Sequence, residues 1–199
     1  MVSTLKFCGI VGSPRKHVNV DSLVSQVLKG ASSKGATTDK IYLNDLNIKP
    51  CQSCGVDPNP KYCLLDDDMK IIYNALQSCD AIVLGSPVYF DTVSAQVKLM
   101  IDRCNCLMPY IKHGDGAFGF ERRMRKHKKG IFIAVAGTAQ EFDTIQTTTG
   151  KGFFNWTSIE LIETILYSHD DDLLGSVKND TKEMKRTFEA GIRLFDMIK

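Results

Sequence analysis

FCGIVGSPR, residues 7–15, joins a short apolar run to an abrupt turn of small residues. Beyond it, Leu23, Val27 and Leu28 recur at helical spacing, so the stretch predicts a strand, a tight turn and a helix. In a parallel α/β sheet such a turn lies at the carboxyl end of the first strand. There the free N–H groups of the following helix face whatever binds. This unit is the starting point for interpreting the rest of the chain.

Three side chains supply hydrogen-bond donors to the turn. Ser13, Arg15 and Asn19 carry a hydroxyl, a guanidinium and an amide, and together with the positive end of the helix dipole they suit a phosphate monoester. The alternative is an ordinary β–α loop in which Ser13 or Asn19 caps the helix and Arg15 is solvated. The spacing is not G-x-G-x-x-G, and no G-x-x-x-x-G-K-[ST] occurs in the chain. Dinucleotide and P-loop motifs are therefore disfavoured.

The composition is that of an ordinary soluble protein. With 199 residues, 43% of them hydrophobic and 24% charged, the chain predicts one domain spanning residues 1–199. A net charge of +2 gives no reason to expect nucleic acid or an anionic membrane as a partner. No apolar stretch approaches the roughly 18 residues of a membrane span, and no secretion signal is apparent. We therefore expect a cytoplasmic protein.

Apolar patterning beyond the opening unit predicts alternating strands and helices. Their β–α–β spacing indicates an α/β protein with a doubly wound parallel sheet and helices on both faces. Five strands fit a flavodoxin-like order of 2-1-3-4-5, whose switch point lies between the first and third strands. The further strands are expected at 37–43, 81–86, 131–136 and 161–167, and the helices at 20–33, 67–77, 94–104, within 139–156, and at 181–198.

Two segments interrupt this pattern. Residues 47–66 contain three prolines and three cysteines, and an irregular segment of this length inside a domain is usually functional. Residues 109–129 carry three glycines and then a basic run at 122–129. We expect a basic insertion here that forms a solvated face or loop. The sharper alternative is a docking surface for an acidic electron-transfer partner or for nicotinamide phosphates.

The loop after the third strand is expected to form a second wall of the site. It reads GSPVYF at residues 85–90. A proline-stiffened loop with aromatic residues can offer a flat surface and backbone N–H groups to a planar heterocycle. The same residues could instead merely cover the end of the sheet.

Taken in order, these motifs resemble the NADPH-dependent FMN reductase superfamily, and within it the iron–sulfur flavoproteins and their relatives. The resemblance covers residues 5–137 well, and EAGIR at 189–193 also looks similar to the last helix of the family. The motifs that carry it are GSPR at 12–15 with Asn19, the cysteines within 51–63, DDM at 67–69, GSPVYF at 85–90 with Lys98, and DR at 102–103.

The resemblance implies FMN as the cofactor. Because the flavin carries the electrons itself, no catalytic side chain is expected. Val20 stands where the family usually has serine or threonine, which removes one hydroxyl donor but leaves the backbone N–H. The implied ligands are Ser13, Arg15, Asn19 and the backbone around Val20 for the phosphate, Pro87, Val88, Tyr89 and Phe90 for the isoalloxazine ring, and Gly137 and Thr138 on a third side.

The cysteine segment departs from the family pattern. Iron–sulfur flavoproteins resemble one another in a C-x2-C-x2-C-x4–7-C run that holds a 4Fe–4S cluster. Here Cys51, Cys54 and Cys63 keep the spacing, but Asp57 replaces one cysteine. A 4Fe–4S cluster normally has four thiolates, whereas three thiolates and a carboxylate could also hold zinc. We expect a metal-free loop with free or redox-active thiols, and keep the cluster and zinc as alternatives.

The expected function is that of an FMN-dependent oxidoreductase. It would pass electrons from NAD(P)H or a ferredoxin-like donor to a quinone, flavin, metal or protein acceptor. The alternatives are an iron–sulfur flavoprotein, a flavodoxin-like electron carrier without a dedicated substrate, and a thiol-redox regulator that uses the three cysteines. The resemblance also implies a homodimer or homotetramer in which residues 88–129 lie near the partner subunit.

Overall fold

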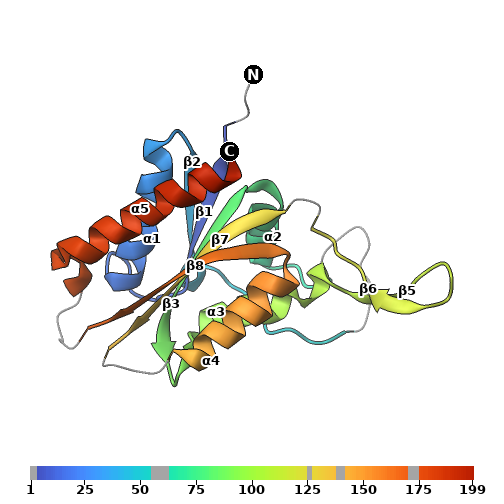
Figure 1. Ribbon diagram of the computed structural model, residues 1–199. Coiled ribbons are helices and arrows are strands. Elements are labelled where there is room, and N and C mark those ends of the chain that lie inside the picture. Colours follow the sequence, from blue (N-terminus) through green and yellow to red (C-terminus); the bar gives the residue numbers. More distant parts are fainter. Residues whose placement is uncertain (1–3, 55–62, 125–126, 138–141, 170–174) are drawn as a thin grey trace.

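A parallel β-sheet runs through the centre of the molecule (Figure 1). The computed structural model describes residues 4–54, 63–124, 127–137, 142–169 and 175–199. The five parallel strands lie in the order β2-β1-β3-β7-β8, which confirms the expected flavodoxin-like order 2-1-3-4-5. Their bounds are β1 Lys6–Val11, β2 Thr37–Tyr42, β3 Ala81–Tyr89, β7 Lys128–Ala136 and β8 Ile159–Ser168.

Helices cover both faces of this sheet. Figure 1 shows α1 and α5 on one side and α3 and α4 on the other. Each face has its own buried apolar cluster, so β1 and β3 are almost wholly buried, as central parallel strands are. The helices are α1 Asn19–Ser33, α2 Met69–Ser78, α3 Ala95–Arg103, α4 Asp143–Gln146, which continues as the π-helix η3 Thr147–Phe154, and α5 Thr181–Ile198.

Two of the expected helix starts are confirmed by their caps. The Ser94 side chain accepts a hydrogen bond from the Val97 N–H at the start of α3, and the Asp180 side chain accepts one from the Glu183 N–H at the start of α5. Both helices therefore begin directly after a polar cap residue. The described residues also form three short 3-10 helices: η1 Leu43–Asp45, η2 Cys104–Leu107 and η4 Ser176–Asn179.

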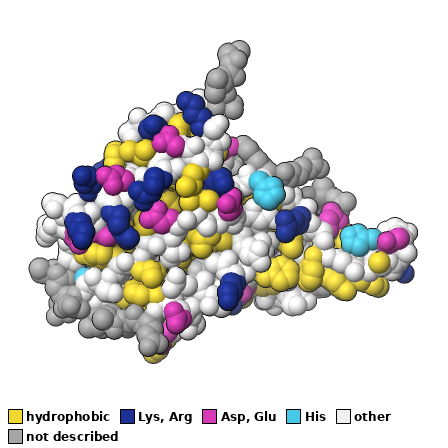
Figure 2. Space-filling view, in the orientation of Figure 1, with side chains coloured by type: hydrophobic (Ala, Val, Ile, Leu, Met, Phe, Trp, Pro, Cys, Tyr) yellow, Lys and Arg dark blue, Asp and Glu magenta, His cyan; other side chains and the backbone are white. Residues whose placement is uncertain are grey.

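Three short strands lie outside the expected pattern. β4, Thr92–Val93, pairs antiparallel with the end of β3. β5, Tyr110–Lys112, and β6, Phe118–Phe120, pair with each other as a hairpin that projects from the sheet (Figure 1). Figure 2 shows hydrophobic side chains along this hairpin, where Tyr110, Phe118 and Phe120 are all exposed.

The expected basic insertion ends earlier than residue 129. Lys128 and Lys129 belong to β7, and Lys128 is buried, so the prediction of a solvated segment is wrong at this end. The Lys128 Nζ donates to the carbonyl oxygens of Gln77, at 3.3 Å, and Cys79, at 2.7 Å. These carbonyls close the carboxyl end of α2, where unpaired oxygens and the helix dipole favour a cation. Among the described residues, no helix has the length and apolar character needed to cross a membrane.

Candidate functional site

The β1–α1 loop and the β3–β4 segment are tied together by backbone and serine hydrogen bonds. The Gly12 N–H donates to the Gly85 carbonyl at 2.8 Å, and the Ser94 hydroxyl donates to the Gly12 carbonyl at 2.7 Å. The Ser94 N–H in turn donates to the Ser86 hydroxyl at 3.0 Å. A Cβ on Gly12 would lie 2.1 Å from Val97, so only glycine permits this approach. The two loops are therefore held in a fixed position relative to each other.

A cavity of about 190 Å³ opens at the carboxyl edge of the sheet between these loops. It contains eight of the ten residues implied to bind FMN, although they come from three separate parts of the chain. The topology brings them together because the carboxyl ends of parallel strands share one edge. The lining residues are Ser13, Arg15, Val18, Asn19, Val20, Pro87, Val88, Tyr89, Val135, Ala136, Gly137 and His169.

Two implied residues are not placed in this cavity. Phe90 is 98% exposed and does not line it, and Thr138 lies outside the described residues. Conversely, the sequence interpretation missed His169, whose backbone N–H donates to the carbonyls of Ala136 and Gly137 at the end of β7. His169 directly follows β8. Its position just after a predicted parallel strand could have indicated that it lies at the ligand-binding edge of the sheet.

The amino end of α1 carries no side-chain cap among the described residues. Val18 occupies the N-cap position, while the Ser13 hydroxyl accepts from the Arg15 N–H at 3.1 Å. The Asn19 side-chain oxygen accepts from the Val177 N–H at 3.2 Å, so neither polar residue caps the helix. The first-turn N–H groups beside the cavity therefore have the chemistry of an anion site.

Asp21 lies in the same first turn but is neutralised from the side of β2. Its carboxylate accepts hydrogen bonds from Lys40, from the His17 N–H at 2.7 Å and from the Tyr42 hydroxyl at 3.0 Å. Burial opposes ionisation of Asp21, but these bonds outweigh it and hold its pKa below the ordinary value. His17 has a φ of 61°, so the carboxylate also fixes a strained turn residue next to the cavity.

The three cysteines of the expected metal run lie in a second region. Cys51 and Cys54 are exposed and Cys63 is half-buried, while Asp57 lies outside the described residues. Within the described part of the chain, no group of three or more His, Cys, Asp or Glu side chains is arranged to hold a metal ion. In the sequence this run offers three thiolates and one carboxylate, whereas a 4Fe–4S cluster normally takes four thiolates.

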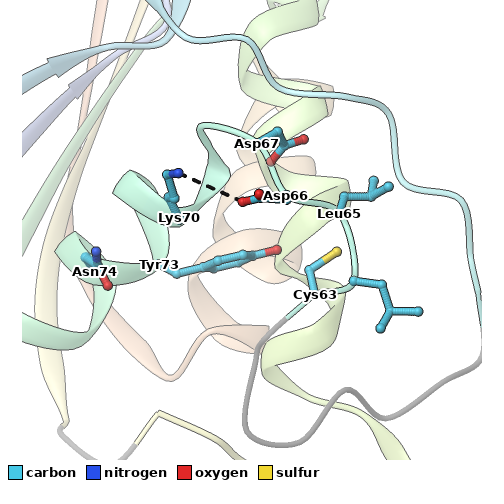
Figure 3. A pocket seen from close by; sticks show the side chains of 8 residues that line it. Cys63, Leu65, Asp66, Asp67, Lys70, Tyr73 and Asn74 are labelled. Atoms are coloured by element: carbon cyan, nitrogen blue, oxygen red, sulfur yellow. Dashed lines mark ion pairs between the residues drawn. The ribbon is translucent and has the colours of Figure 1, made fainter.

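Cys51 and Cys63 also line different cavities. Cys51 borders a cavity of about 580 Å³ together with Phe120 and Trp156. Cys63 borders one of about 260 Å³ with Tyr73, and Figure 3 shows its sulfur and the Tyr73 hydroxyl pointing into the same space. Lys70 and Asp66 form an ion pair of 3.9 Å in this cavity (Figure 3).

A buried ion pair anchors the cysteine segment to α3. The Arg103 guanidinium is fully buried and donates to both oxygens of Asp67, at 2.6 and 3.1 Å. It also donates to the Lys49 carbonyl at 2.8 Å and approaches the Cys63 sulfur at 3.4 Å. Burial opposes ionisation of Asp67, but Arg103 and the N–H groups of Lys49 and Met69 hold its pKa below the ordinary value. One guanidinium thus joins both ends of the segment to the core.

Comparison with known families gives a consistent result. A family model described as NADPH-dependent FMN reductase matches residues 5–162. An iron–sulfur flavoprotein of Methanosarcina thermophila is 35% identical over 203 residues, covering 98% of this chain and 96% of that protein. An iron–sulfur flavoprotein of Methanocaldococcus jannaschii is 39% identical over 207 residues, covering 98% of each chain.

Solved structures share the fold at lower sequence identity. An NAD(P)H:quinone oxidoreductase from Methanothermobacter marburgensis has a TM-score of 0.72 at 14% identity, with 96% of each chain covered. A flavodoxin from the domain Archaea has a TM-score of 0.56 at 13% identity, covering 98% of this chain and 99% of that one. At such identities the likeness shows a common architecture.

Proposed function

Because the chain belongs to the NADPH-dependent FMN reductase family, we propose that it binds FMN in the cavity at the carboxyl edge of the sheet and acts as an oxidoreductase. NAD(P)H is the proposed electron donor, with a ferredoxin-like protein as the alternative, and a quinone, flavin or protein is the acceptor. The observation that carries the proposal is the gathering of eight implied FMN ligands around this one cavity.

The phosphate is assigned to the β1–α1 turn. Arg15 and the N–H groups at the start of α1 supply positive charge and donors, and Ser13 adds a hydroxyl. The Asn19 oxygen is already occupied by Val177, so its amide NH2 is the group assigned to the ligand. Asp21 does not oppose an anion here, because its charge is compensated by Lys40.

The isoalloxazine ring is assigned to the opposite wall. Pro87, Val88 and Tyr89 line it from β3, and Gly137 lines it from the end of β7. A Cβ built on Gly137 meets no described atom within 4 Å, so open space adjoins this backbone. When bound, FMN supplies hydride and electron transfer, and the residues of the chain bind and orient it. Val88 and Val135 give this side of the cavity an apolar lining.

We propose that the chain works without a four-thiolate iron–sulfur cluster. The curated relatives are named iron–sulfur flavoproteins, but this chain has Asp57 in the cysteine run, and Cys51 and Cys63 line separate cavities. The iron–sulfur flavoprotein remains the competing proposal, because the other three positions of the run keep their cysteines.

The first test is an absorption spectrum with iron, sulfide and zinc analysis on protein purified without oxygen. We expect oxidised-flavin bands and no stoichiometric metal. Flavin together with about four iron atoms and matching sulfide per chain would support the competing proposal. A chain that takes up no FMN, even when FMN is added, would overturn the proposed function.

A second measurement separates an enzyme from an electron carrier. With FMN loaded, we expect oxidation of NADPH or NADH that depends on menadione as acceptor. A stable one-electron-reduced flavin with fast electron exchange with ferredoxin and no nicotinamide oxidation would instead indicate a flavodoxin-like carrier.

The proposed assembly is a homodimer or homotetramer, and light scattering measures its mass directly.

A further inference from the structure

The turn between β3 and β4 has an unusual backbone. Phe90 and Asp91 are its two central residues, since Tyr89 pairs with Thr92 across the hairpin. Their φ angles are 49° and 60°, the left-handed combination of a type I′ turn. Glycine and asparagine favour such positions, and aspartate tolerates them, whereas a bulky aromatic residue is a genuine outlier. Local conformation therefore does not explain a phenylalanine at residue 90.

Packing within the chain does not explain it either. Phe90 is 98% exposed, so its ring gains nothing from burial in the core. The preceding residue, Tyr89, is 45% exposed and lines the cavity assigned to FMN. An unburied ring on a strained backbone, one residue after a tyrosine that lines a ligand-sized cavity, points to a function in binding.

The turn is also held in a fixed place. β4 leads directly into Ser94, which is fully buried and hydrogen-bonds Ser86 and Gly12. The Ser86 hydroxyl is itself buried and donates to the Pro87 carbonyl at 2.7 Å. These bonds fix both arms of the hairpin to the cavity wall, so the Phe90 ring is presented by a rigid support.

We propose that Phe90 is a stacking residue for an uncharged planar aromatic acceptor, such as a quinone, that takes electrons from the bound flavin. This inference rests on the proposed function. Phe90 lies outside the cavity lining but adjoins Tyr89, so its ring suits a molecule that approaches the cofactor from solvent. The exposed Asp91 carboxylate next to it disfavours the phosphates of a nicotinamide dinucleotide. In the reaction, two electrons and two protons pass from the reduced flavin to the quinone, giving the hydroquinone and oxidised flavin.

The test measures binding of menadione to the oxidised, FMN-loaded full-length chain by calorimetry. Loss of one aromatic stacking contact in Phe90→Gly and Phe90→Ala raises the menadione Kd about fivefold. Phe90→Tyr keeps a ring and keeps the Kd near that of the wild type. The FMN Kd is unchanged in all three variants, because Phe90 does not line the cofactor cavity.

Thermal unfolding distinguishes the effect of removing the ring from the effect of relieving the backbone strain. Glycine relaxes the left-handed conformation and alanine does not, so Phe90→Gly unfolds at a higher temperature than Phe90→Ala although both lose menadione affinity. An unchanged menadione Kd in both variants overturns the inference. So does a change of oligomeric state in light scattering, which would assign the ring to a second copy of the chain. If the wild type takes up no FMN, the proposed function itself fails, whereas FMN uptake with no effect at Phe90 overturns this inference alone.

Discussion

The cavity at the sheet edge and the cysteine segment are held to the core in opposite ways. The cavity walls are joined by short-range contacts, in which Gly12, Ser86 and Ser94 bond across two loops with small side chains and backbone atoms. In the cysteine segment the main buried link is a long side chain, Arg103, which reaches Asp67, Lys49 and Cys63. Backbone N–H groups of Asn47 and Lys49 add hydrogen bonds to the carboxylates of Asp68 and Asp67. The first region is therefore held by several small contacts, whereas in the second a single buried guanidinium carries the ion pair.

This difference also has an electrostatic side. At the cavity, the N–H groups of the first turn of α1 have no side-chain cap among the described residues. The nearby carboxylate of Asp21 forms an ion pair with Lys40, so its charge is compensated. In the cysteine segment the buried cation is matched within the chain, by Asp67. The cavity therefore suits the anion proposed above, whereas the charges of the segment pair with each other.

The largest effect is expected from Arg103→Met. This substitution leaves Asp67 buried without its partner, and breaking one side of a buried pair costs about 3–5 kcal/mol. Unfolding in urea measures it. The matched control is Asp102→Ala on the same helix, whose pair with Lys98 is exposed and contributes less than about 1 kcal/mol. Equal losses of unfolding free energy in the two variants would show that the buried Arg103–Asp67 pair does not stabilise the cysteine segment.

Arg15→Ala comes next in expected size and tests the other region. Loss of a charge-assisted phosphate contact weakens FMN binding by roughly 1.5–3 kcal/mol. Quenching of FMN fluorescence gives the Kd. Lys16→Ala is the control, because Lys16 is the next residue but pairs with Asp45 at 2.6 Å. An unchanged FMN Kd in Arg15→Ala would place the phosphate elsewhere.

The central elements could be predicted from sequence because their signals are local. β1, β3 and β7 each contain an apolar run, and α3 and α5 begin at polar caps, so pattern and structure agree over these parts of the chain. The cavity followed from the same local signals. Once the strand order was known, residues just after each strand had to meet at one edge.

The features that the sequence did not predict are either too short to show a pattern or depend on contacts between residues far apart in the sequence. β4, β5 and β6 have only two or three residues each, too few to show a period. Lys128 stands in a basic run that indicates solvent, yet it is buried against carbonyls of a helix about fifty residues away in sequence. Arg103 and Asp67 are separated by 36 residues, and no local pattern announces their pairing. The left-handed backbone at Phe90 was not predicted either, because phenylalanine rarely adopts a positive φ.

Ser94→Ala is expected to have a moderate effect on stability. It removes the cap of α3 and the bond to the Gly12 carbonyl, which together cost about 0.5–2 kcal/mol. Urea unfolding measures the loss. Ser33→Ala is the control, because its hydroxyl bonds the Gly30 carbonyl at the exposed end of α1 and its removal changes stability by under about 0.5 kcal/mol. A Ser94→Ala variant as stable as the control would mean that the two loops are joined without this serine.

The smallest expected effect is a change of the unfolding free energy with pH, which depends on one carboxylate in each of the two regions. Asp21 in the cavity region and Asp67 in the cysteine region both have folded pKa values below the ordinary 3.8. Each carboxylate therefore stabilises the fold above that pH, and the stability is lost as the pH falls and the unfolded chain binds protons first. Between pH 5 and pH 4 the two together lose about 0.5 kcal/mol of unfolding free energy. Asp21→Asn, which keeps the side-chain shape, halves this loss in urea titrations at the two pH values. If the loss is undiminished in that variant, the charge of Asp21 does not contribute to stabilising the β1–α1 turn.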